Sequence, residues 1–274
     1  MRYPKIPGLI CIVAILGLGG AALAADSLMM ATTTSTDNTG LLDYLAPHFE
    51  KETGIELKWT AVGTGKALEL GKNCDVDVLM VHAPPAEKQY VADGYGVNRR
   101  QVMYNDFVII GPPGDPAGIA GKDLIAAMKA IRSNKAVFAS RGDDSGTNKK
   151  EISLWKAAGL DVPDKADWYV QTGQGMLTTI RIAAERDGYT MTDRGTYIKY
   201  AHSLGGNPPL KILVEGDEAL LNQYSVIAIN PKHCPDAQYH LAMKFSDWMA
   251  GDAAQKRIAD FRLLEKQLFT PNAK

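Results

Sequence analysis

Neither sign of charge is in excess in this chain, histidine is scarce, and repeats, low-complexity blocks and heptad arrays are missing. The 274 residues include 30 Lys and Arg, 31 Asp and Glu and five His, for a formal net charge of −1. Without a basic surplus there is no surface typical of nucleic-acid binding. The histidines are scattered, and His233 and His240 are seven positions apart, off the spacing of a helical metal-ligand pair. We therefore expect neither a nucleic-acid partner nor a metal site nor a repeat architecture.

The length and composition are those of an ordinary globular protein. The chain is long enough for two domains of usual size or for one large domain. Hydrophobic residues make up 46% of it and charged residues 22%, which is typical of a protein with an apolar core.

The N-terminus has the pattern of a secretory signal. Arg2 and Lys5 precede an apolar run from Ile6 to Leu23, and Ala22-Leu23-Ala24 has small residues at the positions that a signal peptidase reads. A membrane anchor is the competing interpretation, but the run is rich in glycine and ends in that cleavage site. We expect residues 1–24 to be removed, which takes away two positive charges and changes the net charge from −1 to −3. The mature protein should then be soluble and periplasmic.

Cys74 and Cys234 are the two cysteines of the expected mature chain, because Cys11 lies in the apolar run. In an oxidising compartment they either form one disulfide or remain two buried free thiols. His233 beside Cys234 is weak support for thiol catalysis, which requires an activated cysteine. The sequence leaves the pairing open.

Strand-like and helix-like patterns alternate over most of the chain. Leu28 to Ala31, Gly54 to Val62 and Asp77 to His82 have the patterns of strands, whereas Leu41 to Phe49 and Ile119 to Arg132 have helical spacing. Such alternation is typical of α/β proteins with largely parallel sheets.

One strand-to-helix turn carries an unusual set of side chains. The stretch from Ser140 to Glu151, SRGDDSGTNKKE, follows the apolar run from Ala136 to Ala139 and leads into a helix. The first N–H groups of a helix have no helical partner and bind anions. Arg141 has a planar fork of donors that fits a tetrahedral oxyanion, and Asp143 is placed to orient that fork. The alternative interpretation is an ordinary helix cap beside a surface arginine.

Two more turns have the same character. Thr32 to Gly40 is a run crowded with hydroxyl side chains between a strand and a helix, and Gly63-Thr64-Gly65 opens the next helix. The hydroxyl run alone fits N-caps and turn chemistry as well as it fits a binding loop. Gly65-Lys66 is similar to part of a nucleotide P-loop, but Thr60 and Ala67 stand where that loop has glycine and Ser or Thr. We therefore reject nucleotide binding.

The three turns are expected to meet at one place. In an open α/β sheet such turns lie at the carboxyl ends of the strands, where ligands bind. Together they would surround a dianion with hydroxyl and amide donors, with Arg141 as the one formal cation. The expected ligand-binding residues are Thr33, Thr34, Ser35, Thr64, Gly65, Arg141, Ser145, Gly146 and Thr147.

The chain resembles the exported solute-binding proteins of ABC importers, and more narrowly the tungstate-binding TupA type. The residues that carry the resemblance span most of the mature chain. They are Thr32-Thr33-Thr34-Ser35, Val62-Gly63-Thr64-Gly65, Asp77-Val78-Leu79-Met80-Val81-His82-Ala83-Pro84, Tyr104-Asn105-Asp106-Phe107, Ser140-Arg141-Gly142-Asp143-Asp144-Ser145-Gly146-Thr147 and Trp155.

The resemblance implies a type II periplasmic binding protein with two α/β lobes, each built on a central, mostly parallel sheet flanked by helices. Two hinge strands would cross between the lobes near Asp106 and Tyr224. Residues 25–106 and 224–274 would form lobe I, and residues 107–223 would form lobe II. The family implies no catalysis and no cofactor. A monomer would hold one intact oxyanion, tungstate or molybdate, without a metal site and deliver it to a permease in the inner membrane.

The motif is also similar to that of phosphate-binding relatives, in which an aspartate accepts the proton that phosphate retains near neutral pH. His82 stands at the corresponding strand end here. A proton-free dianion needs no acceptor, and an extra carboxylate would repel it. This favours tungstate, molybdate or sulfate over phosphate. His82 is either part of the pocket or a buried structural residue.

Three alternatives to a tungstate carrier remain. A molybdate or sulfate carrier of the same fold would differ only in its ligand. A periplasmic hydrolase would use Ser145 as nucleophile and His82 as base, and these two side chains would have to be in contact. A purely structural exported domain would bind no oxyanion.

Overall fold

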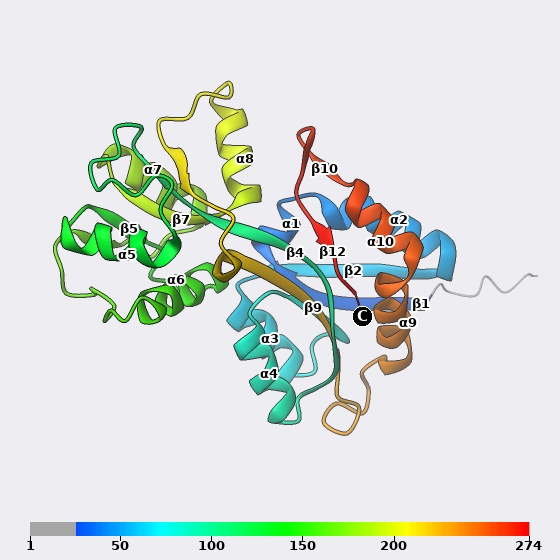
Figure 1. The fold of residues 1–274 in the computed structure, drawn as a ribbon. Coiled ribbons are helices and arrows are strands. Elements are labelled where there is room, and N and C mark those ends of the chain that lie inside the picture. Colours follow the sequence, from blue (N-terminus) through cyan, green and yellow to red (C-terminus); the bar gives the residue numbers. More distant parts are fainter. Residues whose placement is uncertain (1–25, 274) are drawn as a thin grey trace, which may run out of the picture.

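A computed structural model of the chain describes residues 26–273, so the expected signal segment, residues 1–24, lies outside the described part. The described residues form two lobes, and strands β4 and β9 run between them (Figure 1). No helix in residues 26–273 is long and apolar enough to cross a membrane.

The first lobe is built on a sheet in which β1 lies between β2 and β3 and pairs with both in parallel. β9 is antiparallel to β3 and to β4, and β12 is antiparallel to β4. The elements of this lobe are β1 (Asp26–Thr33), α1 (Thr34–Asp37), α2 (Leu41–Thr53), β2 (Ile55–Val62), α3 (Thr64–Lys72), β3 (Val78–Val81), α4 (Pro84–Ala92), the first part of β4 (Gly96–Gly111), β9 (Leu221–Ile229), α9 (Tyr239–Ala250), α10 (Asp252–Asp260), β10 (Arg262–Leu263), β11 (Lys266–Gln267) and β12 (Thr270–Pro271).

The second lobe repeats this plan. β5 pairs in parallel with β6 and β7, and the last part of β4 pairs antiparallel with β7 and β8. Its elements are α5 (Leu124–Ser133), β5 (Phe138–Ser140), α6 (Gly146–Ala157), β6 (Tyr169–Gln171), α7 (Met176–Glu185), β7 (Tyr189–Asp193), α8 (Arg194–Ser203), β8 (Lys211–Val214) and the 3₁₀ turn η1 (Glu218–Leu220). Parallel strands need long crossovers, and helices between them supply these.

Strand β4 belongs to both sheets. Asp106 pairs with Leu221 of β9, and the next residue, Phe107, pairs with Asp193 of β7. At this point Arg194, the first residue of α8, donates to both oxygens of the Asp106 carboxylate at 2.7 and 2.6 Å. Bidentate pairs of this kind are among the stronger polar contacts in proteins. Arg194 therefore ties α8 to the place where β4 changes partner.

Apolar side chains cover both faces of each sheet. In β4, Phe107 and Ile109 belong to one buried cluster, whereas Val108 and Ile110 belong to another. Successive side chains of a strand point to opposite faces, so a strand buried on both sides has an unbroken apolar run. This accounts for the FVII sequence at the end of β4.

The helix that the sequence predicts from Ile119 to Arg132 begins later, at Leu124. Asp123 is its N-cap, and the Asp123 carboxylate accepts a hydrogen bond from Ala126 N at 2.8 Å. Before it, Gly118 (φ 62°) and Gly121 (φ 71°) have left-handed conformations, which a right-handed helix does not accommodate. Apolar residues before Leu124, such as Ile119, therefore pack into the core from a loop and not from a helix.

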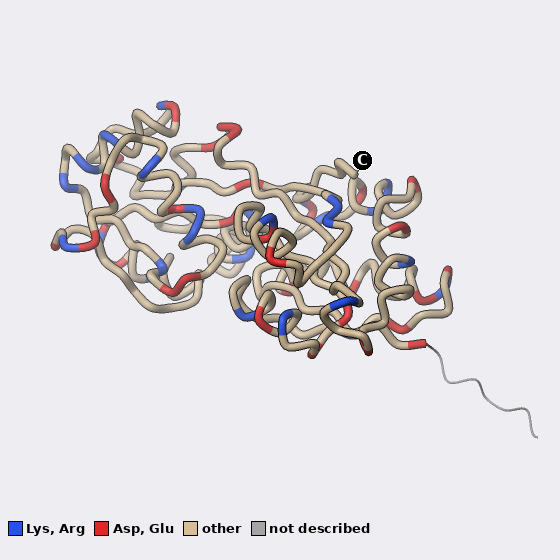
Figure 2. Tube along the Cα trace, turned by 90° about the horizontal axis from the view of Figure 1, so that it is seen from below, with Lys and Arg blue, Asp and Glu red and all other residues tan. Residues whose placement is uncertain are grey.

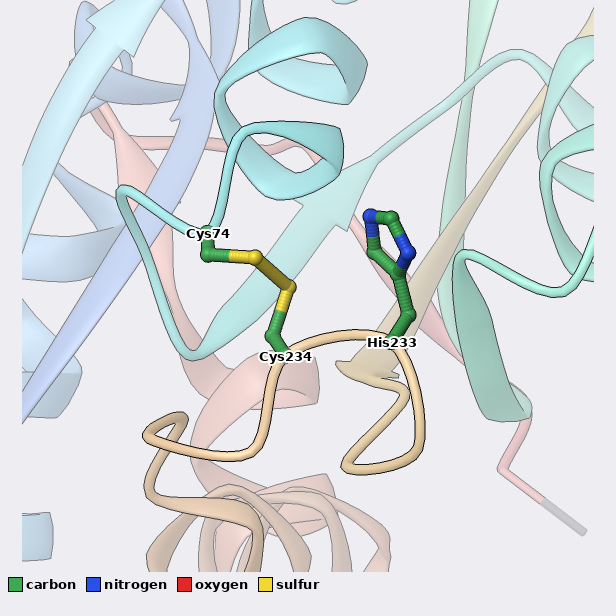
Figure 3. A group of neighbouring side chains, drawn as sticks. All are labelled: Cys74, His233 and Cys234. Carbon is green, nitrogen blue, oxygen red and sulfur yellow. A yellow bond between two sulfur atoms is a disulfide. The ribbon is translucent and has the colours of Figure 1, made fainter.

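Cys74 and Cys234 form a disulfide, with Cα atoms 5.5 Å apart (Figure 3). The bridge joins the segment after α3 to the loop after β9 and decides between the two alternatives that the sequence leaves open. These cysteines and His233 are the one group of potential metal ligands found within residues 26–273. The two sulfurs are bonded to each other, and His233 Nε2 lies 2.8 Å from the carbonyl oxygen of Lys72. These atoms are therefore already engaged within the protein and do not form a metal site.

Candidate oxyanion-binding site

The turn between β5 and α6 places Arg141 just before a helix start. Ser145 is the N-cap of α6, and the Ser145 hydroxyl accepts a hydrogen bond from Asn148 N at 3.2 Å. Gly142 (φ 60°) and Asp144 (φ 57°) have left-handed conformations. These two residues fold the chain back within a few positions, so Arg141 and the N-terminal end of α6 lie together.

Asp143 orients the Arg141 guanidinium. Arg141 Nη2 donates to Asp143 Oδ2, and Asp143 Oδ1 accepts from Ser145 N at 3.2 Å. Burial acts to raise the pKa of Asp143, but the hydrogen bonds from Ser145 and the charge of Arg141 outweigh it and hold the pKa below its ordinary value. Asp143 therefore stays ionised at neutral pH. Arg141 Nε is buried and has no hydrogen-bond partner within residues 26–273.

Buried Glu151 supports this turn from within the second lobe. Its Oε1 accepts from Trp155 Nε1 at 2.8 Å and from the Tyr169 hydroxyl at 2.6 Å, and the Ser140 hydroxyl donates to Oε2. Burial raises the pKa of Glu151. Glu151 thus links the end of β5 to the second turn of α6 and holds the turn between them in place.

On the first lobe, the turn after β1 contacts His82. Thr33 is the N-cap of α1 and accepts from Thr36 N at 3.2 Å. His82 Nε2 lies 3.0 Å from Thr33 Oγ1 and 3.2 Å from Ser35 Oγ, and His82 Nδ1 lies 2.9 Å from Asn222 Oδ1. His82 is 6% exposed, and burial lowers its pKa to about 4. His82 is therefore a buried neutral residue that also contacts two of the expected ligand-binding residues.

The starts of α3 and α6 touch each other across the two lobes. A Cβ atom on Gly146 would lie 3.0 Å from Thr64 Oγ1 and 3.2 Å from His82 Cε1, and a Cβ on Gly65 would lie 3.7 Å from Asp144 Oδ2. Thr64 is 1% exposed, and its hydroxyl has no hydrogen-bond partner in the described chain. The N-cap of α3 is Gly63, which has no side chain to bind the first N–H groups.

A cavity of about 500 Å³ lies between α1, the turn before α6, the start of α7 and α8, and three of its lining residues are expected ligand-binding residues: Thr34, Ser35 and Arg141. The remaining lining residues are Asn38, Thr39, Gly175, Met176, Leu177, Thr178, Gly195, Thr196 and Lys199. The cavity therefore has hydroxyl groups, two cations and the N-terminal end of α7 on its walls.

Six expected residues lie outside the lining of this cavity in the described structure. They are Thr33, Thr64, Gly65, Ser145, Gly146 and Thr147. Thr33, Thr64, Ser145 and Thr147 are buried, and Gly146 and His82 line a second cavity of about 450 Å³. The expected set is thus divided between the cavity walls and the starts of α1, α3 and α6, and of the six residues outside the lining Gly65 alone is exposed.

Two features of the cavity were missed by the sequence reasoning. The turn from Thr172 to Gly175 precedes α7 as the other turns precede their helices, and its glycines were the available signal. Lys199 lies in the middle of α8, and its ammonium donates to the backbone carbonyl of Asn38. Nothing in the local pattern distinguishes Lys199 from other helical lysines. It adds a second cation where the sequence indicated Arg141 alone.

The charged side chains that line the cavity are Arg141 and Lys199. Lys, Arg, Asp and Glu are interspersed along the chain of both lobes (Figure 2). A buried carboxylate, Asp193, caps α8 by accepting from Thr196 N at 2.8 Å and from the Thr196 hydroxyl at 2.7 Å. Burial raises the pKa of Asp193, and the charge of Arg141 acts in the opposite direction. Arg141, Lys199 and the start of α7 therefore make the cavity suitable for an anion.

Comparison with known proteins identifies the family. A model of the PBP superfamily domain matches residues 20–253. The chain is 54% identical over 240 residues to the tungstate-binding protein TupA of Campylobacter jejuni, covering 88% of this chain and 89% of the relative. The chain belongs to the TupA family. The TupA structure from Desulfovibrio alaskensis G20 is 66% identical, with a TM-score of 0.85, and the match covers 91% of this chain and 100% of that one.

A second solved structure of the family extends the likeness. The tungstate ABC transporter structure from Geobacter sulfurreducens is 50% identical to this chain, with a TM-score of 0.77. The match covers 87% of this chain and 100% of that one. The two-lobe α/β fold expected from the resemblance is confirmed.

Proposed function

We propose that this protein captures tungstate between its two lobes in the periplasm and delivers it to the permease of an ABC importer in the inner membrane. The names of its relatives support the ligand. The observation in the molecule that carries the proposal is a pair of buried donors, Thr64 Oγ1 and Arg141 Nε, which have no partner in residues 26–273. A buried donor without an acceptor costs about 1–3 kcal/mol. Oxyanion oxygens would remove that cost.

The lobes supply complementary parts of the site. In this proposal residues 25–106 and 224–274 form lobe I and residues 107–223 form lobe II, with crossings near Asp106 and Tyr224, so β9 passes from lobe II into lobe I. Thr64 and Ser35 then come from lobe I, and Arg141 comes from lobe II. A ligand held by both sides binds the closed form more strongly than the open form, and it shifts the population toward closure.

The donors suit an intact dianion that carries no proton. Arg141 and Lys199 supply two cationic donors, of which Arg141 is paired with Asp143, and the cavity hydroxyls and the N–H groups at the start of α7 supply neutral donors. Tungstate would be bound through its oxygen atoms, with no protein ligand to the metal. Molybdate has the same charge and nearly the same size, so a molybdate carrier is the nearest alternative. Sulfate is smaller, so its oxygen atoms would reach fewer of the same hydrogen-bond donors.

The hydrolase alternative finds no support in the contacts of Ser145. The Ser145 hydroxyl accepts from Asn148 N, while His82 Nε2 faces Thr33 and Ser35. No hydrogen bond joins Ser145 to His82 in the described residues, although a nucleophile and its base have to be in contact. We propose a binding protein without catalytic activity, which acts as a monomer.

Competition calorimetry with tungstate, molybdate, sulfate and phosphate tests the proposal. We expect one oxyanion per chain, tungstate and molybdate bound far more tightly than sulfate, and phosphate bound weakest. The full-length precursor expressed in a bacterium should yield a periplasmic protein that begins after Ala24, and size-exclusion chromatography should show a monomer. The proposal fails if phosphate displaces tungstate at equal concentration or if none of the four anions binds.

A further inference from the structure

His82 lies between the first turn of α1 and the hinge strand β9. Its Nε2 atom faces Thr33 Oγ1 and Ser35 Oγ, and its Nδ1 atom faces Asn222 Oδ1 at 2.9 Å. The side chain is almost fully buried, so these neighbours are the hydrogen-bond partners available to its two nitrogens. Which nitrogen holds the proton therefore decides what the Thr33 and Ser35 hydroxyls can do.

The amide oxygen of Asn222 beside Nδ1 favours a proton on that atom. Asn222 turns its amide oxygen toward Nδ1, because its Nδ2 donates to Asn105 Oδ1 at 2.7 Å. With its pKa lowered to about 4 by burial, the imidazole is neutral at pH 7. Nε2 then carries no proton and accepts a hydrogen bond from a hydroxyl group.

Thr33 has the geometry to supply that proton. The Thr33 oxygen lies 2.6 Å from Thr36 Oγ1 and 3.1 Å from Ser35 Oγ, and it accepts from Thr36 N. A hydroxyl has one proton and two lone pairs. When the Thr33 hydroxyl accepts from the Thr36 N–H and the Thr36 hydroxyl and donates to His82 Nε2, its one proton and both lone pairs are in use. Ser35 lies on the cavity wall and then keeps its own proton for a ligand.

We propose that His82 is a positioning residue whose Nε2 accepts a hydrogen bond from the Thr33 hydroxyl and thereby leaves the Ser35 hydroxyl to donate to the bound oxyanion. This inference rests on the proposed function. Because His82 Nε2 is already used by Thr33, it does not serve as an acceptor for the proton that an anion such as hydrogen phosphate still carries.

The tautomer of His82 is the first test and requires no ligand. Long-range ¹H–¹⁵N spectra of the ¹⁵N-histidine-labelled protein at pH 7, assigned with His82→Asn, should show Nδ1 protonated and Nε2 bare. A proton on Nε2, or an imidazolium, overturns the inference. This result is independent of tungstate binding, so it distinguishes a failure of this inference from a failure of the proposed function.

Two substitutions of His82 form the second test. The side-chain oxygen of Gln reaches the position of Nε2 and can accept from Thr33, whereas the Asn amide reaches only the position of Nδ1. We expect His82→Gln to bind tungstate within about threefold of the parent affinity and His82→Asn to bind it about tenfold more weakly, the loss of one net hydrogen bond. Equal losses in the two variants, at unchanged melting temperature, contradict the positioning role.

Discussion

Gly146 of α6 and Thr64 of α3 meet so closely that one added methyl group would press the helix starts apart. A Cβ on Gly146 would lie 3.0 Å from Thr64 Oγ1, closer than carbon and oxygen atoms pack without adjustment. Gly146 has an ordinary helical backbone conformation. Glycine is therefore needed here for the close contact with the other lobe and not for its conformational freedom.

Gly146→Ala should therefore weaken ligand binding without destabilising either lobe. The added methyl group opposes closure, and we expect the tungstate affinity to fall about tenfold, equivalent to about 1.4 kcal/mol. Calorimetry measures the affinity, and small-angle scattering measures the compaction on adding tungstate. Gly114→Ala is the matched control, because a Cβ there meets no described atom within 4 Å. Equal affinities of the two variants would contradict the prediction.

Thr64→Val should separate affinity from stability. Valine has the shape of threonine but no hydroxyl, so it removes a buried donor that lacks a partner in the described protein. We expect the affinity for tungstate to fall by about 1–3 kcal/mol while the free energy of unfolding without ligand stays equal or rises. Titration and urea unfolding of the same samples check both. Thr64→Ser retains the hydroxyl and should stay near the parent affinity.

Arg141→Ala should cost about 2–5 kcal/mol of tungstate affinity, because it removes a charged donor and leaves Asp143 without its partner. Arg141→Lys keeps the charge but loses the planar fork, and we expect an intermediate affinity. The exposed Arg186 at the end of α7 provides a control, and Arg186→Ala should bind as the parent does. A tungstate titration in which Arg141→Ala matches that control would remove Arg141 from the site.

The burial of His82 predicts a dependence of stability on pH. Its pKa is about 4 in the folded protein and 6.5 when unperturbed, so between these values the unfolded chain binds more protons. The stabilising contribution is therefore complete above pH 6.5 and is lost as the pH falls toward 4, in total about 3 kcal/mol. Urea unfolding from pH 4.5 to 7.5 should give a shallower slope for His82→Asn than for the parent. Parallel curves would show that His82 is not neutral and buried.

Loss of the disulfide should affect stability and leave binding unchanged. Cys74 follows the end of α3, a helix of nine residues whose first residue, Thr64, is at the candidate site. A helix of that length separates the two ends by about 13 Å. We expect Cys74→Ala with Cys234→Ala to lower the free energy of unfolding by about 2–5 kcal/mol, because the bridge closes a long loop. Calorimetric titration of the double variant should give the parent affinity for tungstate.

The sequence predicted the parts of the molecule that depend on neighbours in the chain. The alternation of strands and helices and the turns before α3 and α6 follow from local periodicity and turn chemistry. The contact between His82 and Asn222 could not be predicted from the sequence, because the two residues are 140 positions apart and meet only when β3 and β9 pair. The strands β10 to β12 have two residues each, too few to show a period.

Lys199 and the start of α7 reach the cavity through the relative placement of elements in the second lobe. That placement depends on how α7 and α8 pack on β7, which no short window of sequence reveals. Local patterns therefore identified hydroxyl-rich turns correctly as structural features, whereas the composition of the cavity required the three-dimensional arrangement.

Strand β4 exchanges β9 for β7 between two successive residues, and no loop interrupts it there. A motion of one lobe against the other would bend this continuous strand without unfolding a loop. The contacts that such a motion would break lie at the facing starts of α3 and α6, where Gly146 approaches Thr64. Substitutions at these helix starts should therefore change ligand affinity while the rest of the scaffold stays as it is.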